Sequence, residues 1–540
     1  MTEKCIGIDL GTTYSCLAYI DEDGDPVVEK NFEQEETTPS VILFDEKGEI
    51  IVGSPAKDMS VMYEPGRTIT AIKRQMGSDY TVEIDGESYN PMMLSAVILR
   101  KMINDFNDNH GCDIKSAVIT VPAYFGQNER DCTKIAGSIA GLEKVDLINE
   151  PTAAAIAFGY GNRGEGMKRV LVYDLGGGTF DVTILEIDDG AFTAVATDGE
   201  RYLGGKDWDA AISQVMKQKI SEESGIDIET LNENPEVNQT MVIDSEVLKK
   251  RLSTAQTTKG TLTIDSSRVV YSVSREEFEA ATESLVAQTI EIVNKVMASK
   301  GFTEEDIDDV ILVGGSSRMP QIKAAIANIM PESKIKIFDP DQSVAKGAAI
   351  YAKSLADAEN RAMIAEDVAE EPVIGEDGEV VAAAAAVAAA ENTIVVKNVL
   401  SKTFGIRVIY EDGTEKISNL IFRNEVLPIE ETKVYYPVDD GQTSIKVEIY
   451  EDAAVKDGEG INTELIEGTP VGEFVMDLPD LVTKDTPIEV KFTATEEGIL
   501  VADVDCLGQH CDYTIENDLK MTAEEIQKSQ GLMERVSKGN

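Results

Sequence analysis

Hydrophobic residues are spaced in two different ways along this chain of 540 residues. From residue 1 to about 358, short apolar runs alternate with amphipathic stretches, which predicts β-strands layered with α-helices. From residue 401 to about 515, apolar residues recur at every second position, as in Ile445, Val447 and Ile449. That period predicts an antiparallel β-sandwich. The chain should therefore fold as an α/β domain followed by an all-β domain.

Composition changes sharply between these two regions. Residues 359–400 are acidic and alanine-rich, which predicts an interdomain linker that is helical in part. Its apolar end, Ile394-Val395-Val396, is either the first strand of the next domain or a docking segment that moves between two surfaces. Residues 516–540 predict a single charged helix beginning near Thr522.

Two glycine-rich segments, Asp9–Thr13 and Asp174–Thr179, are nearly the same in sequence. Each lies between two apolar runs, so each predicts a β-hairpin whose turn carries almost no side chains. Glycine lets backbone N–H groups approach an anion closely, and an aspartate at the strand end offers an oxygen ligand for Mg²⁺. One such hairpin is an ordinary tight turn. Two matched copies favour a nucleoside triphosphate held from both sides.

A third glycine cluster, Gly314–Arg318, ends an apolar strand and precedes a predicted helix. Free N–H groups at a helix start suit a phosphate or a ribose, and Arg318 is placed to stack on a base. A helical stretch that could line the same pocket carries Glu246, Lys249, Lys250 and Ser253. The alternative for this stretch is an exposed, salt-bridged helix face.

Charge and composition exclude several classes of protein. With 49 Lys and Arg against 99 Asp and Glu, the net charge of −50 disfavours nucleic acids and anionic membranes as partners. No signal pattern is evident, and the longest apolar run, 380–390, is too short to span a bilayer. Six cysteines fit reduced thiols in the cytoplasm, although Cys506 and Cys511 could face each other across a hairpin.

Five segments occurring in order resemble the DnaK-type, seventy-kilodalton heat-shock chaperones: Ile8–Ser15, Ala117–Phe125, Asn149–Ala155, Asp174–Val182 and Leu203–Gly205. The resemblance covers residues 4–355 closely and 393–515 more loosely. It implies an actin-like (duplicated ribonuclease-H-like) ATPase domain of two lobes and a β-sandwich that binds extended apolar peptides. The implied function is that of an ATP-dependent chaperone with weak ATPase activity.

The resemblance also assigns roles in ATP hydrolysis to individual residues. Asp9 and Asp174 match the carboxylates that hold hydrated Mg²⁺, with K⁺ as a further candidate ion. Lys73 matches the lysine that stabilises the attacking water and the γ-phosphate. Glu150 matches the residue that positions this water, and Thr179 matches the threonine that contacts the γ-phosphate. Phosphoryl transfer needs such positioning and charge neutralisation. The residues matched to ATP or ADP binding are Gly11, Thr12, Thr13, Tyr14, Gly176, Gly177, Gly178, Gly204, Gly205, Glu246, Lys249, Lys250, Ser253, Gly314, Gly315, Ser316, Arg318 and Asp341.

In the sandwich, the resemblance places a peptide cleft. Ile445 matches the central apolar pocket, and Ile409 and Val438 match two side chains that arch over the bound backbone. The cleft is completed by Ile406, Tyr435 and Val447. For each of these residues the alternative is a place in the sandwich core.

This sequence departs from the family pattern at several positions. Asp146 stands where relatives carry a basic residue that contacts a J-domain co-chaperone, so coupling to such a partner is in question. Lys206 replaces an acid, Lys250 replaces an arginine beside the adenine, and Asn398 replaces an acid at the linker end. The helical lid is expected to be reduced to one helix, residues 516–540. A J-domain protein and a nucleotide-exchange factor remain candidate partners of an expected monomer.

Three other functions are compatible with parts of this pattern. A sugar kinase on the same fold would need a catalytic Asp base and no C-terminal sandwich, and the Asn149-Glu150-Pro151-Thr152 motif argues against it. An actin-like filament protein would polymerise with ATP. A holdase or nucleotide-exchange relative that does not cycle would tolerate the altered linker. The sequence favours the ATP-dependent chaperone.

Overall fold

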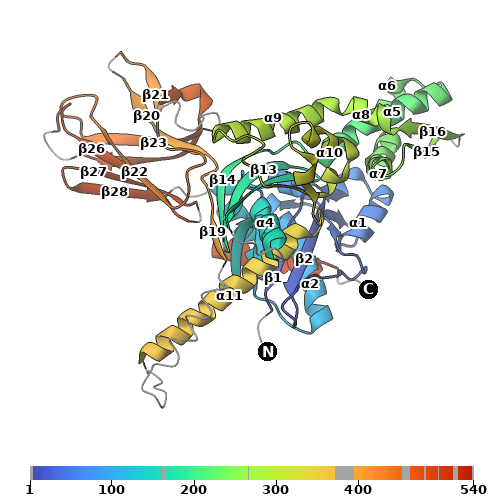
Figure 1. Cartoon of the computed structure of the whole chain (residues 1–540), viewed down its shortest axis with the longest axis horizontal. Coiled ribbons are helices and arrows are strands. Elements are labelled where there is room, and N and C mark those ends of the chain that lie inside the picture. The colour runs from blue at the N-terminus through green and yellow to red at the C-terminus, as the bar shows by residue number, and fades with distance from the viewer. Residues whose placement is uncertain are drawn as a thin grey trace.

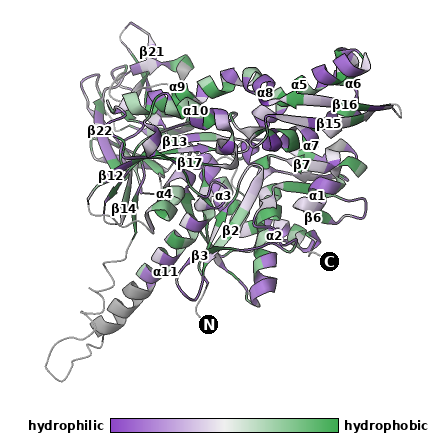
Figure 2. Ribbon diagram, turned by 45° about the vertical axis from the view of Figure 1, so that its right-hand side comes forward, coloured by the Kyte–Doolittle hydropathy of each residue, from purple (hydrophilic) through white to green (hydrophobic). Residues whose placement is uncertain are grey.

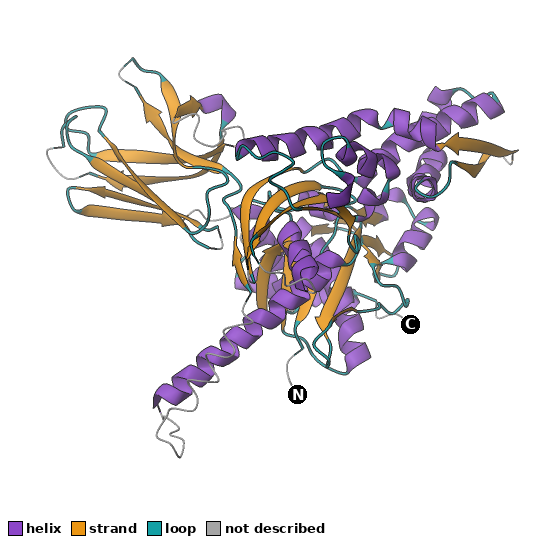
Figure 3. Ribbon diagram, viewed as in Figure 1, coloured by secondary structure: helices purple, strands orange, loops and turns teal. Residues whose placement is uncertain are grey.

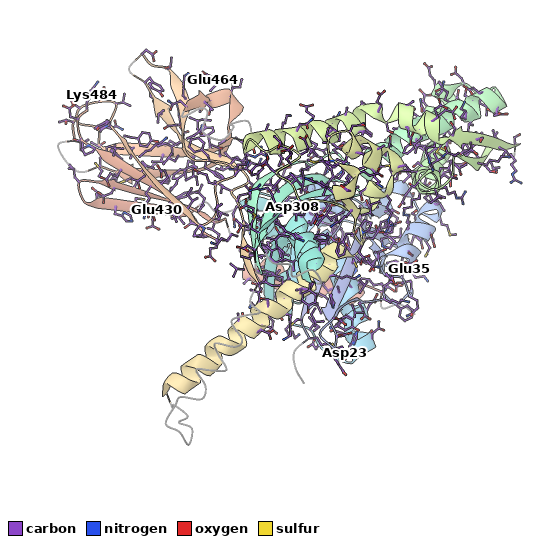
Figure 4. The ribbon with its side chains drawn as sticks, in the orientation of Figure 1. Asp23, Glu35, Asp308, Glu430, Glu464 and Lys484 are labelled. Carbon is purple, nitrogen blue, oxygen red and sulfur yellow. The ribbon has the colours of Figure 1, made fainter. Side chains whose placement is uncertain are left out.

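The computed structural model of the chain describes residues 4–537, apart from 161–165, 189, 265–266, 371–393, 411, 453–461, 479–481, 497 and 515–520. The described residues form two α/β lobes and a body of strands beside them (Figure 1). Apolar residues concentrate on the central strands of the lobes (Figure 2). The labelled carboxylates Asp23, Glu430 and Glu464 point away from the ribbon, so part of the large negative charge lies on the surface (Figure 4).

The first lobe is built on a sheet in the order β11-β10-β1-β2-β3, with β4 paired to β2. β1 is antiparallel to β2 and parallel to β10. A long helix begins at Pro91, where the Asn90 side chain accepts a hydrogen bond from the Met93 N–H at 2.9 Å. The strands are β1 (Ile6–Asp9), β2 (Tyr14–Ile20), β3 (Pro26–Val28), β4 (Thr38–Pro39), β5 (Val41–Phe44), β6 (Ile50–Val52), β7 (Thr68–Thr70), β8 (Val82–Ile84), β9 (Glu87–Tyr89), β10 (Ser116–Val121) and β11 (Lys144–Asn149). The helices are α1 (Ser54–Met59), α2 (Pro91–His110) and α3 (Gln127–Ile139), with short 3₁₀ turns η1 (Ser60–Met62), η2 (Pro65–Arg67) and η3 (Ile72–Gln75).

The second lobe repeats this topology. Its sheet runs β18-β17-β12-β13-β14, with β12 antiparallel to β13 and parallel to β17. The two predicted glycine-rich hairpins, β1–β2 and β12–β13, thus occupy equivalent places in the two lobes. The strands are β12 (Lys168–Leu175), β13 (Phe180–Asp188), β14 (Ala191–Glu200), β15 (Thr257–Ile264), β16 (Ser267–Ser274), β17 (Asp309–Val313) and β18 (Ile335–Ile337). The helices are α4 (Glu150–Tyr160), α5 (Gly205–Ser224), α6 (Ile228–Glu233), α7 (Pro235–Leu252), α8 (Arg275–Ala281), α9 (Glu283–Ser299), α10 (Pro320–Ala327) and α11 (Ser343–Glu370), with 3₁₀ turns η4 (Gly315–Arg318) and η5 (Glu332–Lys334).

Helices α4 and α11 pack at backbone distance between the lobes. A Cβ added to Gly347 would lie 1.7 Å from the Ala153 carbonyl oxygen, and one added to Gly7 would lie 2.2 Å from the Ala349 nitrogen. Ala153, like its neighbours in the alanine-rich start of α4, is fully buried. The small residues on both helices therefore let the two helices approach each other, and the sheet strand β1, at backbone distance.

Helices α8 and α9 are separated by a break, and helix α11 extends into the linker. The break lies at Thr282, whose buried hydroxyl donates to the Phe278 carbonyl at 2.9 Å and exchanges a hydrogen bond with Gln321. That alternative bonding explains why the backbone leaves the helix there. Helix α11 continues to Glu370, so the first part of the predicted linker is helical, as expected for a linker that is helical in part. Residues 371–393 of that linker lie outside the described residues.

The apolar end of the linker forms strand β19 (Val395–Lys397). It extends the sheet of the second lobe, running parallel to β14 with Val395 opposite Ala191. The Ile394 N–H donates to the Ser354 hydroxyl of α11 at 3.0 Å. The segment is therefore docked on the second lobe, because its partner strand belongs to that lobe and not to the sandwich.

The C-terminal region consists of two packed sheets that contain almost no helix (Figure 3). One sheet runs β24-β21-β20-β23-β25 and the other runs β22-β26-β27-β28. Ile449 and Phe492 are fully buried between them. Cys506 and Cys511 are free thiols, because Cys511 lies opposite Val504. The strands are β20 (Thr403–Ile409), β21 (Glu415–Ile421), β22 (Ile429–Tyr435), β23 (Ser444–Asp452), β24 (Asn462–Glu464), β25 (Thr469–Asp477), β26 (Ile488–Ala494), β27 (Leu500–Cys506) and β28 (Gln509–Thr514), with the 3₁₀ turn η6 (Leu465–Glu467).

The last described segment returns to the first lobe, and the C-terminus lies on the opposite side of Figure 1 from the sandwich. Helix α13 (Ala523–Gln530) begins at a capping box between Thr522 and Glu525, in agreement with the start predicted near Thr522. The single helix expected over 516–540 is shorter, because the chain tightens into the 3₁₀ turn η7 (Gly531–Arg535). Met533 and Val536 are buried in the core of the first lobe, and Val536 forms a parallel bridge with Ile50.

Candidate functional site

The two glycine-rich turns meet at a cavity of about 640 Å³ between the lobes. A Cβ added to Gly177 would lie 1.9 Å from the Thr13 hydroxyl oxygen, and one added to Gly178 would lie 2.2 Å from Thr12 Cγ2. Only glycine therefore allows the two turns to approach this closely. Within the second turn, the Gly176 N–H donates to the Thr179 carbonyl at 3.0 Å, which leaves the tip of the turn facing the cavity.

Most of the residues expected at the nucleotide line this cavity. From the sequence-predicted set they are Asp9, Gly11, Thr12, Thr13, Tyr14, Lys73, Glu150, Asp174, Gly176, Gly177, Thr179, Gly205, Glu246, Lys249, Lys250, Ser253, Gly314, Gly315, Ser316, Arg318 and Asp341. Gly178 and Gly204 do not line it, because they stack against each other behind the turn, with a Cβ on Gly204 only 2.5 Å from the Gly178 carbonyl carbon. Lining residues that the sequence did not single out are Thr37, Asp209, Thr254, Met319, Ile337, Pro340 and Val344.

A buried lysine and several carboxylates lie at the floor of the cavity. Lys73, on η3, donates a hydrogen bond to Glu150, the first residue of α4, and both side chains are almost fully buried. Burial by itself would lower the pKa of Lys73, but Glu150 and Asp9 raise it above its usual value. Lys73 is therefore a fixed positive charge beside the two glycine-rich turns.

The carboxylates of this floor hold more negative charge than Lys73 can balance. Burial, with Glu150 nearby, raises the pKa of Asp9 to about 7. The same two causes raise the pKa of Asp174 well above its usual range. A divalent cation would relieve this repulsion, and carboxylate oxygens are the ligands that Mg²⁺ prefers. The residues present thus fit a magnesium ion held at Asp9 and Asp174.

Asp181 does not line the cavity, but its buried carboxylate interacts electrostatically with Glu150 and Asp174, and the sequence analysis did not single it out. It is only 1% exposed, and burial next to Glu150 raises its pKa well above the usual value. One of its carboxylate oxygens has no hydrogen-bond partner among the described residues. The available signal was a charged residue inside the apolar run of β13, where the alternation of that strand predicts an uncharged core side chain.

Glu246 connects the two lobes at the other end of the cavity. Although it lies on α7 of the second lobe, it accepts a hydrogen bond from the Tyr14 hydroxyl of β2 at 2.8 Å and pairs with Lys57 of α1. Lys250 pairs with Glu246 at 2.7 Å and lies over the Tyr14 ring. Burial opposes ionisation of Glu246, but the two lysines outweigh it and hold its pKa at about 2.

The helical stretch of α7 is therefore both salt-bridged and part of the cavity wall. Lys249 is buried, donates to the Gly205 carbonyl at 2.8 Å and pairs with Asp209 at 2.7 Å. Arg318 is fixed at the rim by Asp341, at 2.6 Å. These pairs hold the cationic side chains in defined positions before any ligand binds.

The departures from the family pattern also have defined surroundings. Lys206 donates to the Thr70 hydroxyl of the first lobe at 3.1 Å, and burial beside Arg74 lowers the pKa of Lys206 to about 8. Asp146, on β11, lies 3.6 Å from Lys144, which partly offsets its charge. Asn398, at the linker end, accepts a hydrogen bond from Asn149 at 3.1 Å. Asn149 immediately precedes Glu150, so the linker reaches the residue next to the cavity.

The sandwich contacts the second lobe directly. Arg423 pairs with Asp198 of β14 at 2.7 Å and donates to the Thr197 carbonyl at the same distance. Asn424 accepts from the Thr197 N–H at 3.0 Å and from Lys300 at 3.2 Å. The strand that carries Asp198 thus contacts the sandwich here and the linker strand β19 at its other end.

The candidate peptide-cleft residues separate into two groups. Ile409 and Val438 are 48% and 49% exposed, and Ile445 and Tyr435 are half-buried, with the Tyr435 hydroxyl 2.9 Å from that of Ser418. Ile406 and Val447 are each 5% exposed and lie in the sandwich core. For these two, the core alternative describes the structure, because each faces the opposite sheet.

The fold and the site define a class of protein: a nucleotide-binding domain of two similar lobes, joined by a docked strand to a β-sandwich. The model of the family described as Hsp70 protein matches residues 5–85 and 79–373. The chain belongs to the Hsp70 family.

Curated relatives extend this similarity to almost the whole chain. The chain is 36% identical over 535 residues to the chaperone protein DnaK of Thermosipho melanesiensis, an alignment that covers 97% of this chain and 82% of the relative. It is 37% identical over 514 residues to the DnaK of Thermotoga maritima, covering 94% of this chain and 79% of that protein. The chain is an ATP-dependent molecular chaperone with a weak ATPase activity and acts on unfolded polypeptides. These comparisons give no support to a sugar kinase. Within the described ranges, no helix is both long enough and apolar enough to cross a membrane.

Proposed function

We propose that this chain hydrolyses ATP at the cavity between its lobes and uses the bound nucleotide to control peptide binding in the sandwich. The equivalent hairpins and the repeated topology of the two sheets support an actin-like, duplicated ATPase domain over residues 1–358. Residues 359–400 then act as the linker, residues 401–515 as the peptide-binding domain and residues 516–540 as a helical segment of the lid.

In this proposal the floor of the cavity carries out the chemistry. Lys73 stabilises the attacking water and the γ-phosphate, and its burial beside Glu150 supports a fixed charge at that place. Glu150 orients the water, and Thr179 contacts the γ-phosphate from the second turn. Such preorganised donors act on charge that develops in the transition state.

Metal ions complete the proposed site. Mg²⁺ bound at Asp9 and Asp174 would neutralise phosphate charge, and the raised pKa of both carboxyl groups supports a cation there. K⁺ is a further candidate. The base and ribose would lie against Glu246, Lys250, Ser253 and Arg318, which line the opposite end of the cavity.

The proposed substrate is an extended apolar peptide bound in the sandwich. Ile445 would form its pocket and Ile409 and Val438 the arch above it, because these side chains are at least partly exposed. A J-domain co-chaperone and a nucleotide-exchange factor are proposed partners of a cytoplasmic monomer, and the acidic Asp146 predicts altered contacts with the former.

The observation that carries the proposal is the meeting of both glycine turns above the Lys73–Glu150 pair. We expect Lys73→Ala to lower single-turnover hydrolysis of ATP by about two orders of magnitude, the scale of losing one transition-state donor. ADP binding should stay near normal, because the base and ribose contacts are untouched. The exposed Lys47→Ala serves as the control.

Two results are decisive for this experiment. If Lys73→Ala hydrolyses ATP at the rate of Lys47→Ala, Lys73 has no part in the reaction. A loss of both hydrolysis and ADP binding would point instead to damage of the fold, which circular dichroism of the variant would reveal.

A further inference from the structure

A groove of about 730 Å³ lies between α9 and α10 of the second lobe. The two helices lie side by side at the upper edge of this lobe in Figure 1. None of the residues that line the groove lines the nucleotide cavity. The groove is therefore a separate surface, and the contacts described above do not occupy it.

The floor of the groove is apolar and follows the axes of both helices. Val286 and Ile290 lie one turn apart on α9, and Ile329 lies just past the end of α10; all three are half-buried and pack on the core of the lobe. Ala287 and Ala325 leave room between them. A shallow channel with small residues between apolar ones admits the ridge of a third helix.

The two walls are fastened to each other. The Gln321 amide of α10 donates to the Thr282 hydroxyl, at the junction of α8 and α9, with 3.0 Å between the two atoms. The same Thr282 hydroxyl is bonded to the Phe278 carbonyl at 2.9 Å, so it fixes the break between α8 and α9. The groove is thus preformed, and a ligand need not order it.

One edge of the groove is strongly acidic. Glu276, Glu279 and Glu283 follow one another along α8 and the start of α9. None of these three pairs with a cation within the described part of the chain, whereas Glu291 further along is paired with Lys295 at 2.9 Å. Unpaired carboxylates along one edge complement a basic partner and select against an acidic one.

We propose that this groove binds an amphipathic helix of another protein that has apolar residues on one face and lysine or arginine along one edge. Its apolar side chains at positions i, i+3 or i+4 and i+7 would lie on Val286, Ile290 and Ile329. Its basic edge would face the three glutamates. The chain's own segment 371–393 contains no lysine or arginine, so it has the wrong charge for this groove. This interaction is additional to the peptide cleft of the proposed function and does not depend on it.

The test uses the full chain and a fluorescein-labelled synthetic peptide of 14 residues, with leucines at helical spacing and lysines along one edge. Ala287 is exposed on the floor, so Ala287→Trp fills the groove without disturbing the core. We expect fluorescence anisotropy to show that this variant binds the peptide at least about tenfold more weakly. A loss of that size is expected when one apolar side chain of the peptide loses part of its contact with the groove. The matched control Ala324→Trp, on the outer face of α10, should bind as the unaltered chain does.

A second pair of variants tests the charge. The triple change of Glu276, Glu279 and Glu283 to Gln should weaken binding by roughly fivefold to tenfold and reduce its dependence on salt, as expected for a few exposed ion pairs. A control variant carries the Glu→Gln change at Glu22, Glu46 and Glu83, which are exposed on other parts of the surface. It has the same net charge as the first triple variant and should bind the peptide as the unaltered chain does.

A proline-containing version of the peptide separates the groove from the sandwich cleft. Proline prevents the helix but leaves an extended apolar segment. If this version binds as tightly as the helical one, or if Ala287→Trp leaves binding unchanged, the groove proposal is wrong. Helix-dependent binding that Ala287→Trp removes would support it even if no peptide binds in the sandwich.

Discussion

At the scale of single residues, Asp9 couples the nucleotide site to pH. Its pKa is raised to about 7 by burial and by Glu150, so the empty site binds a proton more tightly than the unfolded chain does. The stability that this protonation contributes is present at low pH and is lost as pH rises toward and through 7. A cation at Asp9 replaces the proton, so its stabilising effect should grow over the same range.

We therefore expect Mg²⁺ with ADP to raise the melting temperature more at pH 8 than at pH 6. Asp9→Asn should abolish this difference and raise the melting temperature of the nucleotide-free chain at pH 8, because it removes a buried charge. The exposed Asp23→Asn is the control. Differential scanning fluorimetry measures both effects. An equal Mg²⁺ gain at the two pH values would contradict the assignment of Asp9.

Sequence patterns located most of the cavity residues, because the glycine turns and the residues matched to them lie in short segments. They missed Asp181, because its raised pKa results from burial beside Glu150, a residue that lies on another strand–helix unit. The resemblance matched Ile406 and Val447 to the cleft, and in the structure both are buried in the sandwich core, so their contact with a peptide stays a prediction. The alternation of apolar and polar residues along a strand identifies its two faces, but it does not show which face is covered by another sheet.

At the scale of elements, the C-terminal segment behaves as part of the first lobe. Met533 and Val536 lie in its core, the Ser537 N–H donates to the Ile50 carbonyl at 2.9 Å, and Arg535 donates to the Gly48 carbonyl at 2.8 Å. The sequence predicted a charged helix beginning near Thr522, where α13 does begin. It could not predict the docking, because a short charged helix carries no signal for a distant partner.

Met533→Ala should therefore destabilise the first lobe by about 2–5 kcal/mol, the usual cost of removing a buried methionine side chain. The neighbouring Glu534→Ala, which removes an exposed side chain, should change the stability by less than about 0.5 kcal/mol. Denaturant unfolding followed by hydrogen exchange at β6 reports on this lobe. Equal stability and equal exchange in the two variants would show that the segment is not docked in solution.

At the scale of the whole molecule, a continuous set of contacts joins the nucleotide cavity to the sandwich. Glu150 at the cavity follows Asn149, which binds Asn398 of the linker, and β19 of the linker pairs with β14. The same β14 carries Asp198, the partner of Arg423 in the sandwich. Because the linker is bonded to the first lobe through Asn398 and to the second lobe through β19, a nucleotide that changes the relative positions of the lobes must change a contact made by the linker.

The central claim is that the nucleotide controls peptide binding, and the rate of peptide release tests it most directly. A labelled leucine-rich peptide is bound to the full chain and its release is followed by stopped-flow fluorescence after mixing with ATP or ADP. We predict that ATP accelerates release at least about tenfold over ADP, within the usual range of coupling between two sites. Ile445→Asp, the control for the cleft, should bind no peptide in either state. Equal release rates with ATP and ADP would contradict the account.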